Sequence, residues 1–204
     1  MNLMKTIYGQ FKQPHGFLGR VAGFIMSKRG SNIQRNQWLV DLMHLKTNDS
    51  ILEIGFGPGL AIEAATKFIT QGTIVGIDHS DIMLAQATQR NSTAISNGKV
   101  KLSQVDISSL PKLEQSFDHI YSANVIQFWS ERTAIFQHLR KSLKQGGKIY
   151  NLYMPRHKSA TSQDAINMAN ALTQELGSAG FKNVQTKSRD FDDLTTVCVI
   201  AQRA

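Results

Sequence analysis

The sequence predicts an α/β fold built on a mostly parallel sheet with helices on both faces. From residue 51 onward, short apolar runs alternate with longer amphipathic runs, and this order is typical of parallel strands joined by helices. Several of the apolar runs are rich in β-branched residues, which favours strands. The chain has 204 residues, of which 41% are hydrophobic, so we expect one structural unit with a substantial core.

The boundaries of the elements follow from these runs and from the residues between them. The predicted strands are ILEI (51–54), TIVGI (73–77), VKLSQV (100–105), FDHIYS (117–122) and GKIYNLY (147–153). The predicted helices are LAIEAATKFITQ, SDIMLAQATQRNSTAI, SERTAIFQHLRKSLKQ and SQDAINMANALTQELGSAG. Ser80 and Ser130 precede helical runs and are interpreted as N-caps. Gly146 and Gly147 are expected to end the third of these helices.

The N-terminal part of the chain is strongly basic. The whole chain has a net charge of +8, and residues 1–40 hold no acidic residue but contain Lys5, Lys12, Arg20, Lys28, Arg29 and Arg35. Such a segment is either a solvated face or a surface that meets an anionic partner. We predict a basic helical N-terminal lid over residues 1–47 and a ligand-binding domain over residues 48–204, which together form one structural unit.

One helix of the predicted lid is indicated by an apolar stripe. The run NIQRNQWLVDLMHLK places Trp38, Leu42 and Leu45 on one helical face, at the spacing of an amphipathic helix. We interpret this stripe as a face that packs on the domain rather than as a binding surface.

Cysteine content and the N-terminus bear on the compartment of the protein. The single cysteine, Cys198, lies in the apolar run TTVCVIA, which excludes a disulfide framework and a cysteine metal cluster. No group of His, Cys or carboxylate residues has metal spacing, so we expect no metal. The run FLGRVAGFIM is interrupted by Arg20 and has about half the ~20 residues that a membrane span needs. We expect a soluble, cytoplasmic protein, and peripheral membrane contact through the basic segment stays open.

A glycine-rich loop follows the first predicted strand. The stretch ILEIGFGPG (51–59) has glycines at alternate positions, which allow a tight turn and close approach of a ligand to the backbone. A dinucleotide fingerprint requires a third small residue, but Leu60 or Ile62 stands there, depending on the register. Glu53 also brings a negative charge close to where a pyrophosphate would lie. The loop therefore favours a ligand that is cationic or carries an ammonium group.

These residues resemble the first motif, E/D-x-G-x-G-x-G, of the class I S-adenosylmethionine-dependent methyltransferases, in the group that includes the ubiquinone-biosynthesis and type 11 enzymes. The resemblance implies that Gly55, Gly57 and Gly59 wrap the aminoacyl part of S-adenosyl-L-methionine, while Glu53 holds the loop and the amino group of the cofactor. It also implies a Rossmann-like sheet of seven strands, with 48–204 as the cofactor-binding methyltransferase domain. ELGSAGFKNVQ resembles the last helix and sixth strand, and TTVCVIA the antiparallel seventh strand.

Two further stretches resemble motifs of this family. In GIDHS, the resemblance assigns Asp78 to the ribose hydroxyls, and His79 is a candidate to frame the ribose or the adenine. The DIML that follows implies that Ile82 or Met83 packs on the adenine.

The likeness continues after the third and fourth predicted strands. In QVDISSLP, Asp106 is expected to accept a hydrogen bond from the adenine amino group, and Ile107 to offer its backbone amide. In FDHIYSANVIQFW, Asn124 occupies the position that lines the methionine end of the cofactor.

Methyl transfer from a sulfonium is an in-line displacement that depends mainly on positioning in a dry site, so a base is not always required. The catalytic residue is therefore unknown, with His15 and His157 as candidates. We expect transfer to a small-molecule acceptor that is acidic or lipid-like. Nucleic acid is disfavoured because SANV replaces the tetrapeptide that amino-methylating nucleic-acid enzymes often carry.

Two alternatives stay open. In the first, the enzyme methylates a phospholipid headgroup or a quinone precursor at a membrane surface, with FLGRVAGFIMSKR as an interfacial helix. In the second, the protein binds S-adenosylmethionine without catalysis. The acceptor atom and the oligomeric state are not indicated by the sequence.

Overall fold

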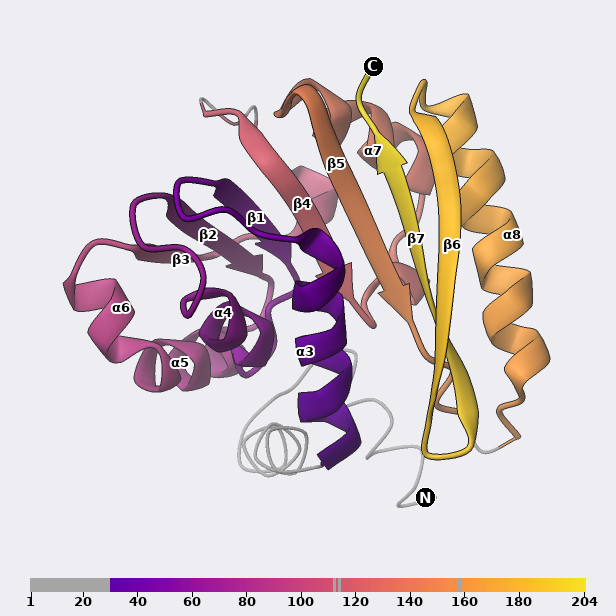
Figure 1. Ribbon diagram of the computed structural model, residues 1–204, viewed down its shortest axis with the longest axis horizontal. Helices are drawn as coiled ribbons and strands as arrows, with labels where there is room; N and C mark the ends of the chain where they lie inside the picture. Colours follow the sequence, from indigo (N-terminus) through magenta and orange to yellow (C-terminus); the bar gives the residue numbers. More distant parts are fainter. Residues whose placement is uncertain (1–29, 112, 114, 158) are drawn as a thin grey trace.

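A computed structural model describes residues 30–111, 113, 115–157 and 159–204 of the chain. Within these residues, seven strands form one sheet in the order β3-β2-β1-β4-β5-β7-β6 (Figure 1). The strands are β1 (Ser50–Ile54), β2 (Thr73–Asp78), β3 (Val100–Gln104), β4 (Phe117–Ala123), β5 (Leu143–Tyr153), β6 (Lys182–Phe191) and β7 (Leu194–Gln202). Strands β1 to β5 pair in parallel, and β7 is antiparallel to both β5 and β6. The predicted sheet, including its antiparallel last strand, is confirmed.

Helices cover both faces of the sheet, as predicted. They are α3 (Gly30–Met43), α4 (Leu60–Ala65), α5 (Asp81–Arg90), α6 (Ser92–Ser96), α7 (Arg132–Lys141) and α8 (Ser162–Ser178), with short 3-10 turns η1 (Ile107–Ser109) and η2 (Ile126–Phe128). One core cluster packs α7 and α8 against the sheet, and a second packs α3, α4 and α5 against the opposite face. Successive side chains of β1 point to opposite faces of the sheet, so Leu52 belongs to the first cluster and Ile51 to the second.

Several predicted helix boundaries are wrong. The third predicted helix ends at Lys141, and Gly146 and Gly147 lie inside β5, where the pairing with β4 shifts register between Phe117 and His119. The glycine pair therefore lies at an irregularity in a strand and does not end a helix. The first predicted helix stops at Ala65, because the chain then turns so that several backbone amides donate to Thr47 O.

The predicted N-caps have different outcomes. Ser80 caps α5, since its Oγ accepts the Met83 amide at 3.3 Å. Ser130 is not the cap of α7, because Glu131 occupies that position with a φ of 51° and no side-chain hydrogen bond. The second predicted helix is divided at Asn91, whose Nδ2 donates to Gly59 O at 3.2 Å and to Ala87 O at 3.0 Å.

Helix α3 confirms the predicted helix and shows where its faces lie. Leu39, Val40 and Met43 are its most buried apolar residues, while Trp38 and Leu42 are partly buried at the margin of the same core. The buried side continues toward the start of the helix with polar residues, namely Ser31, Asn32, Arg35 and Asn36. The helix is therefore apolar where it covers the sheet and polar where it reaches the ends of the strands.

No helix in the described part of the chain is both long and apolar enough to cross a membrane. The division between a lid and a domain at residue 47 stays a prediction. Of residues 1–47, the structure describes residues 30–47, where α3 is the helix.

Candidate active site

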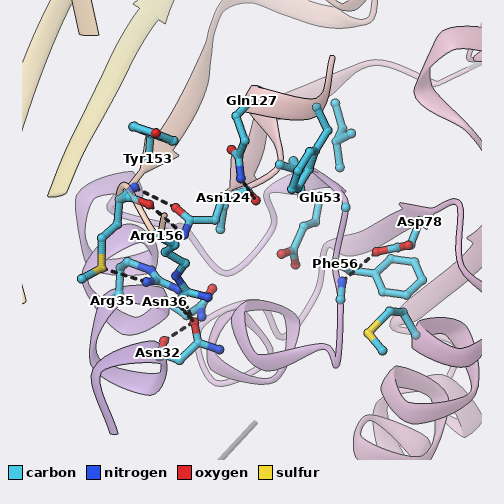
Figure 2. Close-up of a pocket in the computed structure, with 18 of the residues that line it drawn as sticks. Asn32, Arg35, Asn36, Glu53, Phe56, Asp78, Asn124, Gln127, Tyr153 and Arg156 are labelled. Atoms are coloured by element: carbon cyan, nitrogen blue, oxygen red, sulfur yellow. Dashed lines mark hydrogen bonds between the residues drawn. The ribbon is translucent and has the colours of Figure 1, made fainter. Parts of the chain in front are cut away.

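A cavity of about 820 Å³ lies at the carboxyl ends of the parallel strands, within the range of roughly 300–1,000 Å³ that small-molecule and cofactor sites occupy. Its walls come from the loops after β1 to β5, from the polar end of α3 and from the β6–β7 hairpin. Ligands of open α/β sheets bind at this edge, where the strands end. Figure 2 shows some of the side chains that line the cavity.

The glycine loop after β1 forms one wall of the cavity. Gly55, Gly57 and Gly59 all have positive φ angles, of 71°, 51° and 79°. A side chain at Gly55 would clash with Val125, whereas a Cβ at Gly57 would meet no atom within 4 Å. Gly57 therefore faces open space. Gly59 does not line the cavity; it stands at the N-cap of α4.

Glu53 is a buried carboxyl group at the base of this loop. Its exposed fraction is 1%, and its Oε2 accepts a hydrogen bond of 3.0 Å from the Tyr121 hydroxyl. Burial raises the pKa of Glu53 well above its ordinary value; the Tyr121 hydrogen bond lowers the pKa and the nearby Asp78 charge raises it further. A cationic group or hydrogen-bond donor placed beside Glu53 would stabilise its ionised form.

Asp78 ties the end of β2 to the glycine loop. Its Oδ2 accepts the Gly57 amide at 2.9 Å and its Oδ1 accepts the Ser80 amide at 2.9 Å. Burial raises the pKa of Asp78, and these amide hydrogen bonds oppose that rise. The next residue, His79, places Nδ1 at 3.5 Å from Asp78 Oδ1. Asp78 therefore holds the loop at Gly57 in position.

The other predicted cofactor residues also line the cavity. Met83 is buried in α5, while Asp106 and Ile107 stand at the start of η1. Asp106 Oδ1 accepts hydrogen bonds from Ser108 N at 2.8 Å and Ser108 Oγ at 2.7 Å, which lower the pKa of its carboxyl group.

Asn124 joins the ends of β4 and β5. Its Oδ1 accepts the Met154 amide at 2.8 Å and its Nδ2 donates to Met154 O at 3.3 Å. Its φ of 56° is a left-handed conformation that asparagine adopts more readily than most residues. This bridge holds the floor of the cavity between the two strands.

Of the two histidines predicted as candidate catalytic residues, one can be located in the structure. His157 lines the cavity, with Nε2 at 3.4 Å from Asp164 Oδ2 and Nδ1 at 3.3 Å from Ser159 Oγ. His15 lies outside the described residues. No group of three or more His, Cys, Asp or Glu residues suited to a metal ion occurs within the described ranges.

Some cavity residues were not selected from the sequence. Arg35, Asn32 and Asn36 come from α3, Arg156 follows β5, and Gln127 lies in η2. Arg35 was recognised as part of a basic segment, but its burial was not predicted. A useful signal was present, since Asn32, Arg35 and Asn36 continue, at helical spacing, the face that carries Leu39, Val40 and Met43.

Comparison with known proteins shows what the chain is similar to. Residues 51–147 match the family model described as a methyltransferase domain. An uncharacterised methyltransferase, YdaC of Bacillus subtilis, is 27% identical over 183 residues, which cover 90% of this chain and 98% of the relative. The magnesium protoporphyrin IX methyltransferase of Synechocystis PCC 6803, solved with bound S-adenosylmethionine, superposes with a TM-score of 0.65 at 18% identity, covering 85% of this chain and 80% of that one.

The methyltransferase-domain match and the methyltransferase relatives support a class I S-adenosylmethionine-dependent methyltransferase. This methyltransferase is also 30% identical over 154 residues to phosphoethanolamine N-methyltransferase 2 of Caenorhabditis elegans. That match covers 70% of this chain but 35% of the relative, so the chain spans about a third of the length of that protein.

The residues of the methyltransferase fit its cofactor, S-adenosyl-L-methionine. Gly57 faces open space in the cavity, as a loop that wraps a ligand requires. Glu53 supplies a buried carboxyl group that suits an ammonium and would disfavour a pyrophosphate. The sequence analysis disfavoured a dinucleotide because Leu60 or Ile62 stands where a small residue is required, and this agrees with S-adenosyl-L-methionine as the cofactor.

Proposed function

We propose that this methyltransferase transfers the methyl group of S-adenosylmethionine to a small-molecule acceptor that is acidic or lipid-like. The observation that carries the proposal is that one continuous cavity joins the glycine loop and Asp78 to a second region around Arg35. The name of the Caenorhabditis elegans relative specifies a phosphorylated amine as its substrate, which supports an acceptor with an acidic group.

We propose further that the cofactor lies along the ends of β1 to β4. Asp78 and His79 would hold the ribose, Met83 would pack on the adenine, and Asp106 with Ile107 would recognise the adenine edge. Gly55, Gly57, Glu53 and Asn124 would hold the methionine end. Support comes from their common cavity and from the Gly57 amide, which is already fixed by Asp78 at 2.9 Å.

S-adenosylmethionine supplies a methyl group that is activated by a positively charged sulfur. The chain therefore has to orient the acceptor and exclude water. Phe56, Trp129 and Met154 line the cavity and are buried, with exposed fractions of 3%, 8% and 4%, so they provide dry walls. For an acceptor that must lose a proton, His157 is the proposed base, because it lines the cavity and Asp164 Oδ2, at 3.4 Å from Nε2, would stabilise the protonated ring.

Calorimetric titration with S-adenosylmethionine, S-adenosylhomocysteine and NADH in parallel tests this function. We expect micromolar binding of the first two ligands and no binding of NADH. Transfer of a labelled methyl group to phosphorylated and carboxylated amines, alcohols and lipids would then identify the acceptor. Binding of NADH alone would contradict the proposal, and cofactor binding without any transfer would favour a non-catalytic role.

Replacement of Gly57 by alanine is expected to weaken cofactor binding while leaving a folded protein. The new methyl group would stand in the open space that the cofactor needs, and the positive φ adds a strain of roughly 1–2 kcal/mol. We expect a loss of affinity of about tenfold or more by calorimetry. Gly55→Ala is the matched control: its methyl group would strike Val125, so it should lower the melting temperature further. Equal affinity of Gly57→Ala and wild type would refute the placement of the loop.

Asp106→Ala is expected to have a smaller effect on cofactor affinity. The side chain is exposed, and the change removes one hydrogen bond to the adenine and the Ser108 contacts that shape η1. The expected loss is roughly 1.5–3 kcal/mol, the contribution of a hydrogen bond to a charged group. Calorimetry with adenosine and with S-adenosylmethionine should show the same loss, and an effect on the second ligand alone would place Asp106 elsewhere.

A further inference from the structure

A row of paired residues crosses the sheet at the position of Glu53. Pairing of β1 with β4 sets Glu53 opposite Tyr121, and pairing of β4 with β5 sets Tyr121 opposite Tyr150. On its other side, Glu53 is paired with Gly76 of β2. Residues that are paired in this way point to the same face of a sheet, here the face that α3, α4 and α5 cover. Tyr121 and Gly76 are therefore the neighbours of Glu53 on that face.

Of these two neighbours, Tyr121 provides the polar contact. Gly76 has no side chain, and a Cβ there would meet Phe56, Ile62 and Leu102 at 2.8, 2.9 and 2.8 Å, so apolar atoms fill the space on that side. Among the described residues, the hydrogen bond that the Glu53 carboxyl group accepts comes from the Tyr121 hydroxyl, which donates to Oε2 at 3.0 Å. The orientation of Glu53 thus depends on that hydroxyl.

Tyr121 lies beneath the cavity and Glu53 at its surface. The exposed fraction of Tyr121 is 0%, and Glu53, exposed by 1%, lines the cavity whereas Tyr121 does not. Figure 2 shows the Glu53 carboxyl group in the middle of the view of the cavity. Because the Tyr121 hydroxyl holds Oε2, Oε1 is the oxygen that is left for a ligand. Any effect of the hydroxyl on a ligand therefore passes through Glu53.

A phenol hydroxyl suits this position because it donates a hydrogen bond without carrying a charge. A lysine or arginine in its place would neutralise the Glu53 carboxylate. Burial, and then the charge of Glu53, raise the pKa of Tyr121 well above its ordinary value, so the hydroxyl keeps its proton and stays a donor. The carboxylate is thus held in place and keeps the negative charge that attracts an ammonium group.

The hydrogen bond also restricts a flexible side chain before a ligand arrives. Glutamate has many rotamers, and ordering such a side chain during binding weakens affinity. The ring of Tyr121 is fixed in the core that α3, α4 and α5 form with the sheet, so its hydroxyl can hold the carboxyl group in one orientation. A carboxylate that is already oriented binds its partner more tightly than one that must be ordered.

We propose that Tyr121 is a positioning residue, which directs the Glu53 carboxylate toward the ammonium group of S-adenosylmethionine. This inference rests on the proposed function, since it needs the methionine end of the cofactor beside Glu53. The ammonium group would donate to Oε1 while the Tyr121 hydroxyl holds Oε2. The inference adds to the site a residue that does not line the cavity and that was not selected from the sequence.

The test is calorimetric titration of two ligands into the full chain at one fixed pH. S-adenosylhomocysteine carries the amino-acid end of the cofactor, and methylthioadenosine lacks it. Tyr121→Phe keeps the ring and removes the hydroxyl. We expect this variant to bind S-adenosylhomocysteine about tenfold more weakly than the wild type and methylthioadenosine within about twofold. A purely structural role would weaken both ligands alike.

Tyr150→Phe is the matched control. Tyr150 is the next residue of the same row, has an exposed fraction of 2%, and does not line the cavity. The change again removes one hydroxyl from a buried tyrosine of the same core. Both ligands should bind this variant within about twofold of the wild type. The melting temperatures of the two variants verify that each is folded.

A double-mutant cycle tests whether Tyr121 acts through Glu53. Residues that act on a ligand through one another give effects that do not add. In a Glu53→Gln background, which lacks the carboxylate charge, Tyr121→Phe should therefore change the affinity for S-adenosylhomocysteine by no more than about twofold.

The outcomes separate this inference from the proposed function. Failure of S-adenosylhomocysteine to bind the wild type would overturn the proposed function. If the wild type binds it, three results overturn the inference alone: wild-type affinity for S-adenosylhomocysteine in Tyr121→Phe, an equal loss for both ligands, or an undiminished loss in the Glu53→Gln background. A loss that is confined to S-adenosylhomocysteine and absent without the Glu53 carboxylate supports it.

Discussion

Asp78→Ala is expected to lower the affinity for S-adenosylmethionine at least about a hundredfold. The change removes the proposed ribose acceptor and also the carboxylate that holds the Gly57 and Ser80 amides, each at 2.9 Å. Hydrogen bonds to a charged group contribute roughly 1.5–3 kcal/mol each, and about 1.4 kcal/mol corresponds to tenfold in affinity. The loss of the loop anchor and of the ribose contact should therefore combine. Calorimetric titration at a fixed pH measures the effect.

Asp81→Ala is the matched control for this prediction. Asp81 lies in the first turn of α5, is exposed, and accepts only the neighbouring Ile82 amide in the contacts described. We expect its affinity for the cofactor to stay within about twofold of the wild type, since surface substitutions usually change free energies by less than about 0.5 kcal/mol. Binding by Asp78→Ala as tight as that of this control would show that the end of β2 does not hold the ribose.

Glu53→Gln is expected to stabilise the free protein while weakening cofactor binding. Because burial raises the pKa of Glu53, the folded chain holds its proton more tightly than the unfolded chain. The contribution of this group to stability is therefore fully present below the unfolded pKa of about 4.3 and is lost as the pH rises toward the folded pKa. A glutamine side chain does not titrate, and its amide oxygen can still accept the hydrogen bond from the Tyr121 hydroxyl.

Urea unfolding across a pH series, with and without S-adenosylmethionine, tests both parts of this prediction. Without cofactor, the variant should become more stable than the wild type as the pH rises above about 4.3. With cofactor the order should reverse, because glutamine lacks the charge that attracts an ammonium group.

Glu63→Gln is the control for Glu53→Gln, because Glu63 is exposed in α4 and pairs with Arg90 at 2.9 Å. Its effect should be small and similar with and without cofactor. A Glu53→Gln protein that binds the cofactor like the wild type would remove Glu53 from the site.

The fold and the proposed cofactor half of the site follow largely from local patterns. The loop after β1 is encoded by consecutive residues, and Asp78, Asp106 and Asn124 each follow an apolar run. Because parallel strands end at one edge of a sheet, residues that follow separate strands are brought together without further information. Gly59 is the exception among the predicted residues, since its positive φ serves the start of α4 and not a cavity wall.

The part of the cavity around Arg35 was not predictable in the same way. Arg35 and Arg156 meet through Asn32 because α3 packs beside the end of β5, and no local periodicity encodes that contact. The end of α7 was misplaced for a related reason. Glycine marks both helix ends and strand irregularities, and only the pairing of β5 with β4 decides between them.

The shared oxygen of Asn32 also bears on how the chain is made. Translation delivers α3 early, whereas Met154 and Arg156, which complete the surroundings of Arg35, leave the ribosome after most of the sheet has been synthesised. The apolar end of α3 packs in a core that also contains late residues, among them Leu152 of β5 and Cys198 of β7. The surroundings of the helix that comes first in the described chain are therefore supplied in part by residues that lie more than a hundred positions later.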